Sequence, residues 1–251
     1  MTSYSNSFRL GRMFGIDVFI DATILLPVAL VAFSGAEQGT DGIIIGITFA
    51  TIIFLSVLLH EFGHALAARR CGIGTERITL GMLGGVAQLG GRIAQPGRPV
   101  RDRLSVGEDL FITAAGPAVN LVIWGLGLTA LSSLDALDSA GRFWIRATAQ
   151  MNLQLLWFNL IPAFPMDGGR ILNALLQLKF PLLSAFRITN QVARVAAAGM
   201  AVWAVFIYME SNHVPFMLLF IAWMVFSNAN QTLRYLRAAE MQVGQGRTDG
   251  R

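Results

Sequence analysis

Long apolar stretches separated by short polar loops recur along the whole chain. About 20 apolar residues are enough to cross a bilayer as a helix, and the pattern predicts six spans. They cover approximately residues 22–34, 42–68, 109–131, 143–160, 192–208 and 214–226, and the fourth continues irregularly to residue 178. We therefore expect an all-α polytopic membrane protein with one domain over residues 1–251 and an uncleaved first span.

A shorter period marks β structure at two places. Residues 16–21 alternate apolar and charged side chains, a pattern typical of a strand. Residues 77–89 predict two short strands around Gly84-Gly85, inside a glycine-rich loop over residues 71–107. This loop is too apolar to be wholly solvated, so we expect a small β hairpin at the membrane interface.

Composition strengthens the membrane interpretation. The chain is 54% hydrophobic and 14% charged, whereas soluble domains carry about 25% charged residues. This hydropathy excludes a soluble peptidase with a single anchor. The net charge of +4 comes from basic residues that gather in alternate loops, which is the positive-inside pattern. It predicts a multi-pass protein of the plasma membrane with both termini cytoplasmic, and it argues against a nucleic-acid partner.

Candidate metal chemistry begins at His60-Glu61-Phe62-Gly63-His64, where an uncharged apolar run ends. In a helix, the spacing of four puts both imidazoles on one face, about 6 Å apart along the axis. Such a pair can hold one zinc ion, and Glu61 can act as the general base for water. Ionisable groups at the bilayer centre cost roughly 2.5–3.5 kcal/mol each on insertion scales, and a bound metal would offset that cost.

Asp167 is the second candidate, because prolines and glycines break the helix around it. Pro162 and Pro165 remove backbone donors, and Gly168-Gly169 loosens the backbone further. Irregular backbone at membrane depth is tolerated where it is buried in protein or lines a wet cavity. Catalytic zinc sites typically have three protein ligands, and Asp167 is the best available third. The alternative is that Asp167 only caps the following helix.

Taken together, these segments resemble the site-2 protease family of intramembrane zinc metalloproteases. The resemblance rests on the HExxH motif at 60–64 and on an NxxPxxPxDGG motif over 159–169, with support from Gly116–Asn120 and Gly84–Ala87. The chain resembles the compact bacterial and archaeal branch without PDZ or CBS domains, which includes the sporulation proteases. The resemblance implies one Zn²⁺ per chain, held by His60, His64 and Asp167, with Glu61 as the catalytic base.

Several residues outside the proposed metal ligands also have candidate roles. The resemblance implies that Asn159 orients substrate or stabilises the oxyanion, but an Asn that ends a helix by bonding nearby backbone fits equally. Gly84, Gly85 and Val86 are expected to bind an unwound substrate stretch as an added strand. We interpret Asn120 as a helix-packing residue beside Gly116, and Arg170 as snorkelling to the interface rather than contacting the ligands.

The predicted function is hydrolysis of a peptide bond within or near a transmembrane segment, as in regulated intramembrane proteolysis. Expected partners are the lipid bilayer and single-span or other transmembrane protein substrates; a regulatory membrane partner and a homo-oligomer stay open. The alternative is a non-proteolytic membrane protein, such as a metal-ion transporter or an inactive regulatory homologue. A transporter would need polar groups along a path through the bilayer. Here they gather near the cytoplasmic ends of the second and fourth spans, which favours the protease.

Overall fold

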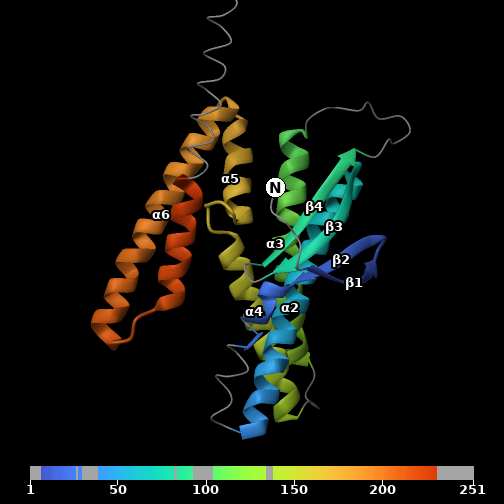
Figure 1. The fold of residues 1–251 in the computed structure, drawn as a ribbon, viewed down its shortest axis with the longest axis vertical. Helices are drawn as coiled ribbons and strands as arrows, with labels where there is room; N and C mark the ends of the chain where they lie inside the picture. The colour runs from blue at the N-terminus through green and yellow to red at the C-terminus, as the bar shows by residue number, and fades with distance from the viewer. Residues whose placement is uncertain are drawn as a thin grey trace, which may run out of the picture. The chain divides into compact units, whose positions relative to one another are not determined.

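The computed structural model describes residues 7–26, 28–29, 39–81, 84–92, 104–133 and 138–230 (Figure 1). The chain divides into two compact units. The first contains residues 1–104 and 111–157, and the second contains residues 105–110 and 158–251. Each unit is described by itself, and the single domain expected from the sequence stays a prediction.

A four-stranded sheet lies in the first unit, in the order β1-β2-β3-β4. Its strands are β1 (Ser7–Met13), β2 (Ile16–Asp21), β3 (Ile73–Gly81) and β4 (Gly84–Arg92). The pairs β1·β2 and β3·β4 are antiparallel, and β2·β3 is parallel. The strand predicted over residues 16–21 is confirmed. Strand β1 was not predicted, because its arginines and glycine interrupt the alternation of its apolar side chains.

The second hairpin corrects one detail of the sequence prediction. Gly84 pairs with Gly81, and Gly85 pairs with Leu80, so both glycines belong to strand β4 and not to the turn. The turn residues 82–83 lie outside the described residues. Gly85 is required for a close approach to another side chain, which is described below, rather than for chain reversal.

Helix α2 (Gly39–Arg70) packs its C-terminal half against the sheet (Figure 1). The shared core contains apolar side chains of three elements: Ile16, Val18, Leu58, Phe62, Ala65, Ile78 and Leu80. Phe14, between β1 and β2, meets Phe62 edge-on with 5.3 Å between ring centroids. Its carbonyl accepts a 2.6 Å hydrogen bond from Arg69 Nη2. The sheet is thereby fixed to the part of α2 that carries the histidine motif.

Most of α3 (Val106–Ser133) and most of α4 (Ser139–Asn159) complete the first unit. Glycines set how closely they pack. A Cβ at Gly63 on α2 would lie 2.7 Å from the Ala115 carbonyl oxygen on α3, and a Cβ at Gly127 would lie 2.7 Å from Ala149 Cβ on α4. Substitution at either glycine would force the helices apart, as expected for helices that meet through small residues.

The second unit contains α5 (Asp167–Gln177), α6 (Leu182–Ser211) and the helix Phe216–Asn230. Its core joins small side chains of α6 and of the helix Phe216–Asn230 to the segment before α5: Ala163, Met166, Ala193, Ala197, Val225 and Ala229. Helix α6 begins at Leu182, about three helical turns before the predicted start at residue 192. Pro181 takes its N-cap position, which is compatible with the missing N–H of proline.

Among the described residues, three helices are long and apolar enough to cross a membrane: α2, α3 and α6. Helix Phe216–Asn230 is apolar but shorter. The spans predicted over 42–68, 109–131, 143–160 and 214–226 coincide with helices to within a few residues. The first predicted span opens with a 3₁₀ turn, Ala22–Ile24, and much of the remainder lies outside the described residues. A membrane-spanning helical protein with a small sheet is therefore confirmed as the fold class.

Candidate metal centre

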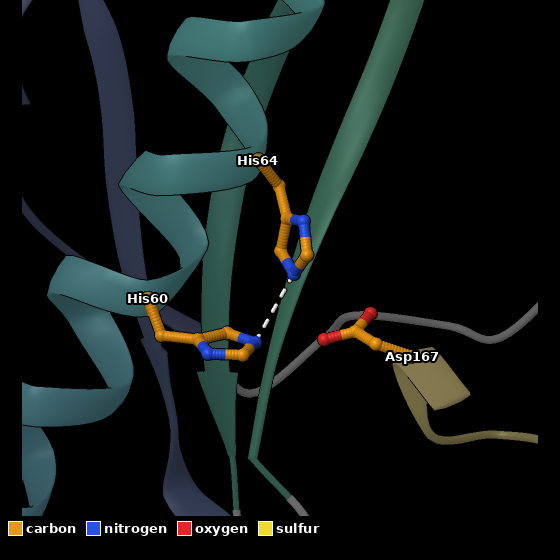
Figure 2. A group of neighbouring side chains, drawn as sticks. All are labelled: His60, His64 and Asp167. Carbon is orange, nitrogen blue, oxygen red and sulfur yellow. Dashed lines mark hydrogen bonds between the residues drawn. The ribbon is translucent and has the colours of Figure 1, made fainter. Parts of the chain in front are cut away.

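His60 and His64 lie one turn apart on α2 and direct their imidazoles to the same side of the helix (Figure 2). Both side chains are buried, with exposed fractions of 5% and 6%. Their Nε2 atoms are 3.1 Å apart. The predicted pairing of the two histidines is thus present within the first unit.

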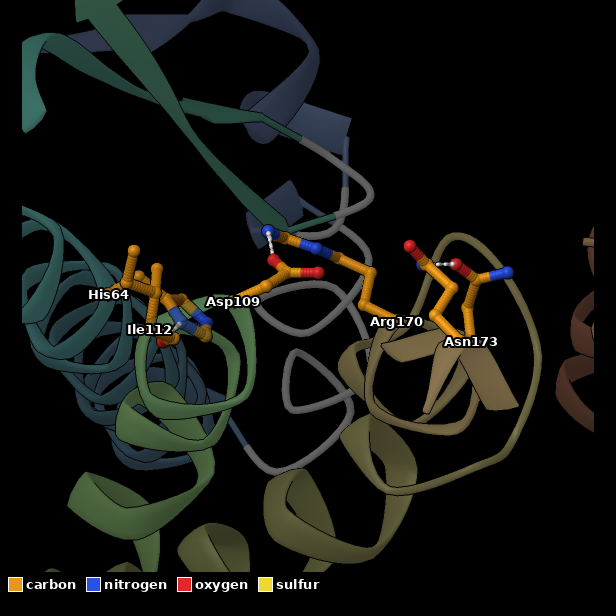
Figure 3. A network of polar contacts seen from close by, with 6 residues as sticks. His64, Asp109, Ile112, Arg170 and Asn173 are labelled. Carbon is orange, nitrogen blue, oxygen red and sulfur yellow. Dashed lines mark hydrogen bonds and ion pairs between the residues drawn. The ribbon is translucent and has the colours of Figure 1, made fainter. Parts of the chain in front are cut away.

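The outer nitrogen of each ring has an oxygen partner. His64 Nδ1 lies 2.8 Å from the Ile112 carbonyl oxygen, which can only accept, so this nitrogen carries the proton (Figure 3). His60 Nδ1 lies 2.6 Å from Asn120 Oδ1, another acceptor. A neutral imidazole that donates through Nδ1 has an unprotonated Nε2. Both rings therefore present a lone pair at Nε2, the form in which histidine binds metals.

This arrangement fits a zinc ion. Two lone pairs that face each other across 3.1 Å repel, and a shared cation removes the repulsion. Two imidazole nitrogens on one tetrahedral zinc lie about 3.3 Å apart, from a Zn–N distance of about 2.0–2.1 Å. The separation of the Nε2 atoms is close to that value.

Gly116 on α3 makes room for the two rings. A Cβ at this position would overlap His64 Nε2 and would lie 2.7 Å from His60 Nε2. Any larger residue would occupy the space in which the two nitrogens meet. The sequence pattern indicated a helix-packing role for Gly116, and its small size also permits the histidine pair.

Asn120 contacts a proposed zinc ligand, which corrects its interpretation as a packing residue. It is fully buried, accepts from His60 through Oδ1, and donates through Nδ2 to Asn152 Oδ1 at 2.8 Å. Asn152 was not singled out from the sequence, although an Asn in the middle of a long helix with many apolar residues is an available signal. These hydrogen bonds link α2, α3 and α4.

Glu61, the neighbour of His60, faces strand β4. Its Oε2 accepts a 3.2 Å hydrogen bond from the backbone N–H of Ala87. A Cβ at Gly85 would lie 2.7 Å from Glu61 Cδ and would overlap Cγ. Only glycine allows the strand to pass this close to the carboxylate, so the structure gives Gly85 a role that the turn prediction missed.

Asp167 is the first residue of α5 in the second unit, and it is buried (Figure 2). Met166 takes the N-cap position and makes no side-chain cap hydrogen bond, so the alternative that Asp167 is the helix cap is wrong. The two glycines that follow allow tight packing: Cβ atoms at Gly168 and Gly169 would overlap backbone between Leu160 and Phe164. The helix break and the glycines together place this carboxylate in the first turn of α5.

Arg170 and Asp109 form an ion pair within the second unit (Figure 3). Arg170 Nη2 lies 3.2 Å from Asp109 Oδ1, and both side chains are about one-third exposed. Arg170 therefore has a specific carboxylate partner, which the snorkelling interpretation did not include. Asn159 is the last residue of α4 and is half-buried. Its predicted role toward substrate stays a prediction.

Comparisons with known proteins agree with this chemistry. The sequence matches peptidase family M50 over residues 48–137 and 127–207. A zinc metalloprotease of Methanocaldococcus jannaschii is 34% identical over 191 residues, which cover 76% of this chain and 52% of that protein. Stage IV sporulation protein FB of Bacillus subtilis is 25% identical over 160 residues, which cover 62% of this chain and 49% of that protein. The chain thus spans about half the length of these curated relatives.

A solved structure is also similar, the site-2 protease from Methanocaldococcus jannaschii. It superposes with a TM-score of 0.62 and 29% sequence identity, and the match covers 90% of this chain and 94% of that one.

Proposed function

We propose that this chain, which belongs to peptidase family M50, is a zinc-dependent endopeptidase that cleaves other membrane proteins within or near a transmembrane segment. The observation that carries the proposal is the histidine pair. Two buried imidazoles are both held in the metal-binding tautomer with Nε2 atoms 3.1 Å apart, next to a carboxylate in the same helix turn. Regulated intramembrane proteolysis is the corresponding biological role.

His60, His64 and Asp167 are the proposed ligands of one Zn²⁺. Two imidazoles and one carboxylate are a usual set for catalytic zinc, which keeps a further position open. The burial of Asp167 supports its assignment, because a carboxylate rarely stays buried unless it is paired or binds a metal. When bound, zinc supplies Lewis acidity that polarises a carbonyl and lowers the pKa of water to about 7.

Glu61 is the proposed general base and acid. Its carboxylate takes a proton from the attacking water and passes that proton to the nitrogen of the leaving amine. The hydrogen bond from Ala87 N–H to Oε2 restricts the rotation of the carboxylate. Asn159 is the proposed group that orients the substrate or stabilises the developing oxyanion.

Strand β4 is the proposed binding edge for substrate. It pairs with β3 on one side, and among the described strands its other side has no neighbour. An unwound stretch of a transmembrane segment exposes backbone groups that can pair with such an edge. Gly84, Gly85 and Val86 would supply the nearest backbone, since Gly85 already lies against Glu61. This pairing would bring a substrate carbonyl close to the general base.

The proposed location is the plasma membrane, with several spans and with both termini in the cytoplasm. Arg69 and Arg70 at the end of α2 support this orientation, because basic residues favour the cytoplasmic side. The proposed substrates are single-span or other transmembrane proteins. The same cleavage assay can test whether cleavage depends on a regulatory membrane partner or on self-association.

The test is cleavage of co-expressed membrane proteins by the wild-type chain and by Glu61→Gln. A library of single-span proteins, scored by release of a cytoplasmic reporter, should contain substrates that only the wild-type chain cleaves. Glu61→Gln keeps the size of the side chain and both imidazoles, so it should keep zinc and lose cleavage. Cleavage by Glu61→Gln would contradict the mechanism. Zinc uptake into proteoliposomes without any cleavage would favour a transporter instead.

A further inference from the structure

We propose that Asn152 is a positioning residue for the zinc ligand His60 and that it acts through Asn120. The proposal rests on the zinc site proposed above. Asn152 is on α4, Asn120 is on α3 and His60 is on α2, so the effect would pass across three helices of the first unit. Nothing in the sequence motifs or in the family match assigns a role to Asn152.

The direction of the hydrogen bonds is fixed at the end far from the zinc site. Asn152 Nδ2 lies 2.9 Å from the Thr148 carbonyl oxygen and 3.0 Å from Ser56 Oγ. A backbone carbonyl can only accept, so the NH₂ group of Asn152 must point toward it. The amide oxygen of Asn152 must then point the other way, toward Asn120.

The orientation of Asn152 in turn determines the orientation of Asn120 and the tautomer of His60. Asn152 Oδ1 accepts from Asn120 Nδ2 at 2.8 Å, which turns Asn120 Oδ1 toward His60 Nδ1 at 2.6 Å. His60 must then donate from Nδ1, and its Nε2 is left unprotonated. If Asn120 were rotated by half a turn, its NH₂ group would face Nδ1 and would favour the other tautomer. That tautomer carries a proton on the nitrogen that is needed for zinc.

Burial makes it energetically costly to rotate either amide of this hydrogen-bond network. Asn120 and Asn152 have no exposed surface, and Ser56 is 4% exposed. Water cannot replace a lost partner there, so a rotated amide would leave buried polar groups unpaired. Groups that bond a ligating histidine typically change metal affinity by about 10–100-fold when they are removed. Asn152 lies one step farther out, so we expect the lower end of that range.

The experiment measures zinc affinity directly, by competition with a chelator of known affinity, on the full chain in detergent. Asn152→Leu should raise the zinc dissociation constant by about tenfold. The d–d absorption bands of the Co²⁺-loaded protein should shift, because the ring of His60 is no longer held in one orientation. Asn152→Ala serves as a second variant if leucine prevents folding, and circular dichroism monitors the helices of both.

A double-mutant cycle separates this role from a structural one. If Asn152 acts through Asn120, then adding Asn152→Leu to Asn120→Leu should change the dissociation constant by less than about twofold. The matched control is Asn190→Leu on α6, because Asn190 is also fully buried and its amide makes no hydrogen bond within the described residues. This control should leave the Co²⁺ spectrum unchanged.

The outcomes are distinct. Folded Asn152 variants with wild-type zinc affinity, or effects of the two asparagines that simply add, would overturn the role of Asn152 and leave the protease proposal intact. A wild-type chain that binds no zinc would overturn the proposed function itself.

Discussion

The backbone N–H of Ala87 and the carboxylate of Glu61 are joined by a 3.2 Å hydrogen bond, which ties strand β4 to the proposed general base. Two residues earlier, Gly85 passes so close to the same side chain that a Cβ would lie 2.7 Å from Glu61 Cδ. The strand proposed to bind substrate is therefore in direct contact with the residue proposed to transfer the proton.

The first prediction follows from this contact. Gly85→Ala should push the Glu61 carboxylate away from its position and lower the rate of cleavage by about 100-fold, the usual cost of a misplacement of about 1 Å. Zinc content should be unchanged, because the three atoms nearest to the added Cβ all belong to Glu61 and not to a histidine. The control is Gln88→Ala on β4, because the Gln88 side chain is exposed and accepts a hydrogen bond from Arg77. Wild-type cleavage by a folded Gly85→Ala chain would show that the approach of β4 to Glu61 is irrelevant to catalysis.

The second prediction concerns the space between the histidines. Gly116→Ala should reduce bound zinc to a small fraction of one ion per chain, because the added methyl group would occupy the region where both Nε2 atoms meet. Gly125→Ala is the matched control on α3, since its added Cβ would have no atom within 4 Å. Metal analysis by mass spectrometry after gel filtration gives the stoichiometry. Full zinc in Gly116→Ala would mean that the metal lies elsewhere.

A third prediction tests the ligand set. His60→Ala, His64→Ala and Asp167→Asn should each lower zinc content, because a three-ligand site loses much of its affinity with one ligand. Asp167→Asn keeps the size of the side chain and removes the charge, so the first turn of α5 should stay intact by circular dichroism. Retention of one zinc ion per chain by this variant would assign the third ligand to another residue.

Local sequence patterns predicted the elements that carry the chemistry. The HExxH spacing fixed the relation of His60 to His64, since both lie on one helix and their geometry depends only on the helical repeat. The alternation over residues 16–21 and the helix break before Asp167 were read from neighbouring residues in the same way. Each of these features is decided within about ten residues of chain.

The features that were missed depend on contacts between distant segments. Asn120 bonds a residue 60 positions away, and Asn152 bonds Ser56 across 96 positions. A single sequence contains no record of such pairings. Gly85 was assigned to a turn because a glycine pair usually marks one, whereas its position is required by a side chain on another element. The close approach of a strand to a helix cannot be read from the sequence of either one.

The last prediction concerns orientation in the membrane. His64 lies about 8 Å from Arg69 along α2, and His60 lies about 14 Å from it, at about 1.5 Å per residue. If Arg69 marks the cytoplasmic surface, the proposed zinc site lies below that surface and short of the midplane. Water would reach it from the cytoplasm, and cleavage would release a product to that side.

Single cysteines in a Cys71→Ser background can test this orientation with a thiol reagent that does not cross membranes. Gln88 on strand β4 and Ser139 at the start of helix α4 are both exposed, and we expect them on opposite faces of the membrane. In intact cells, Ser139→Cys should be labelled, and Gln88→Cys should react only after the membrane is permeabilised. The reverse pattern would place the sheet outside the cell, and the argument for release of a product into the cytoplasm would then fail, because the basic end of α2 would face the wrong compartment.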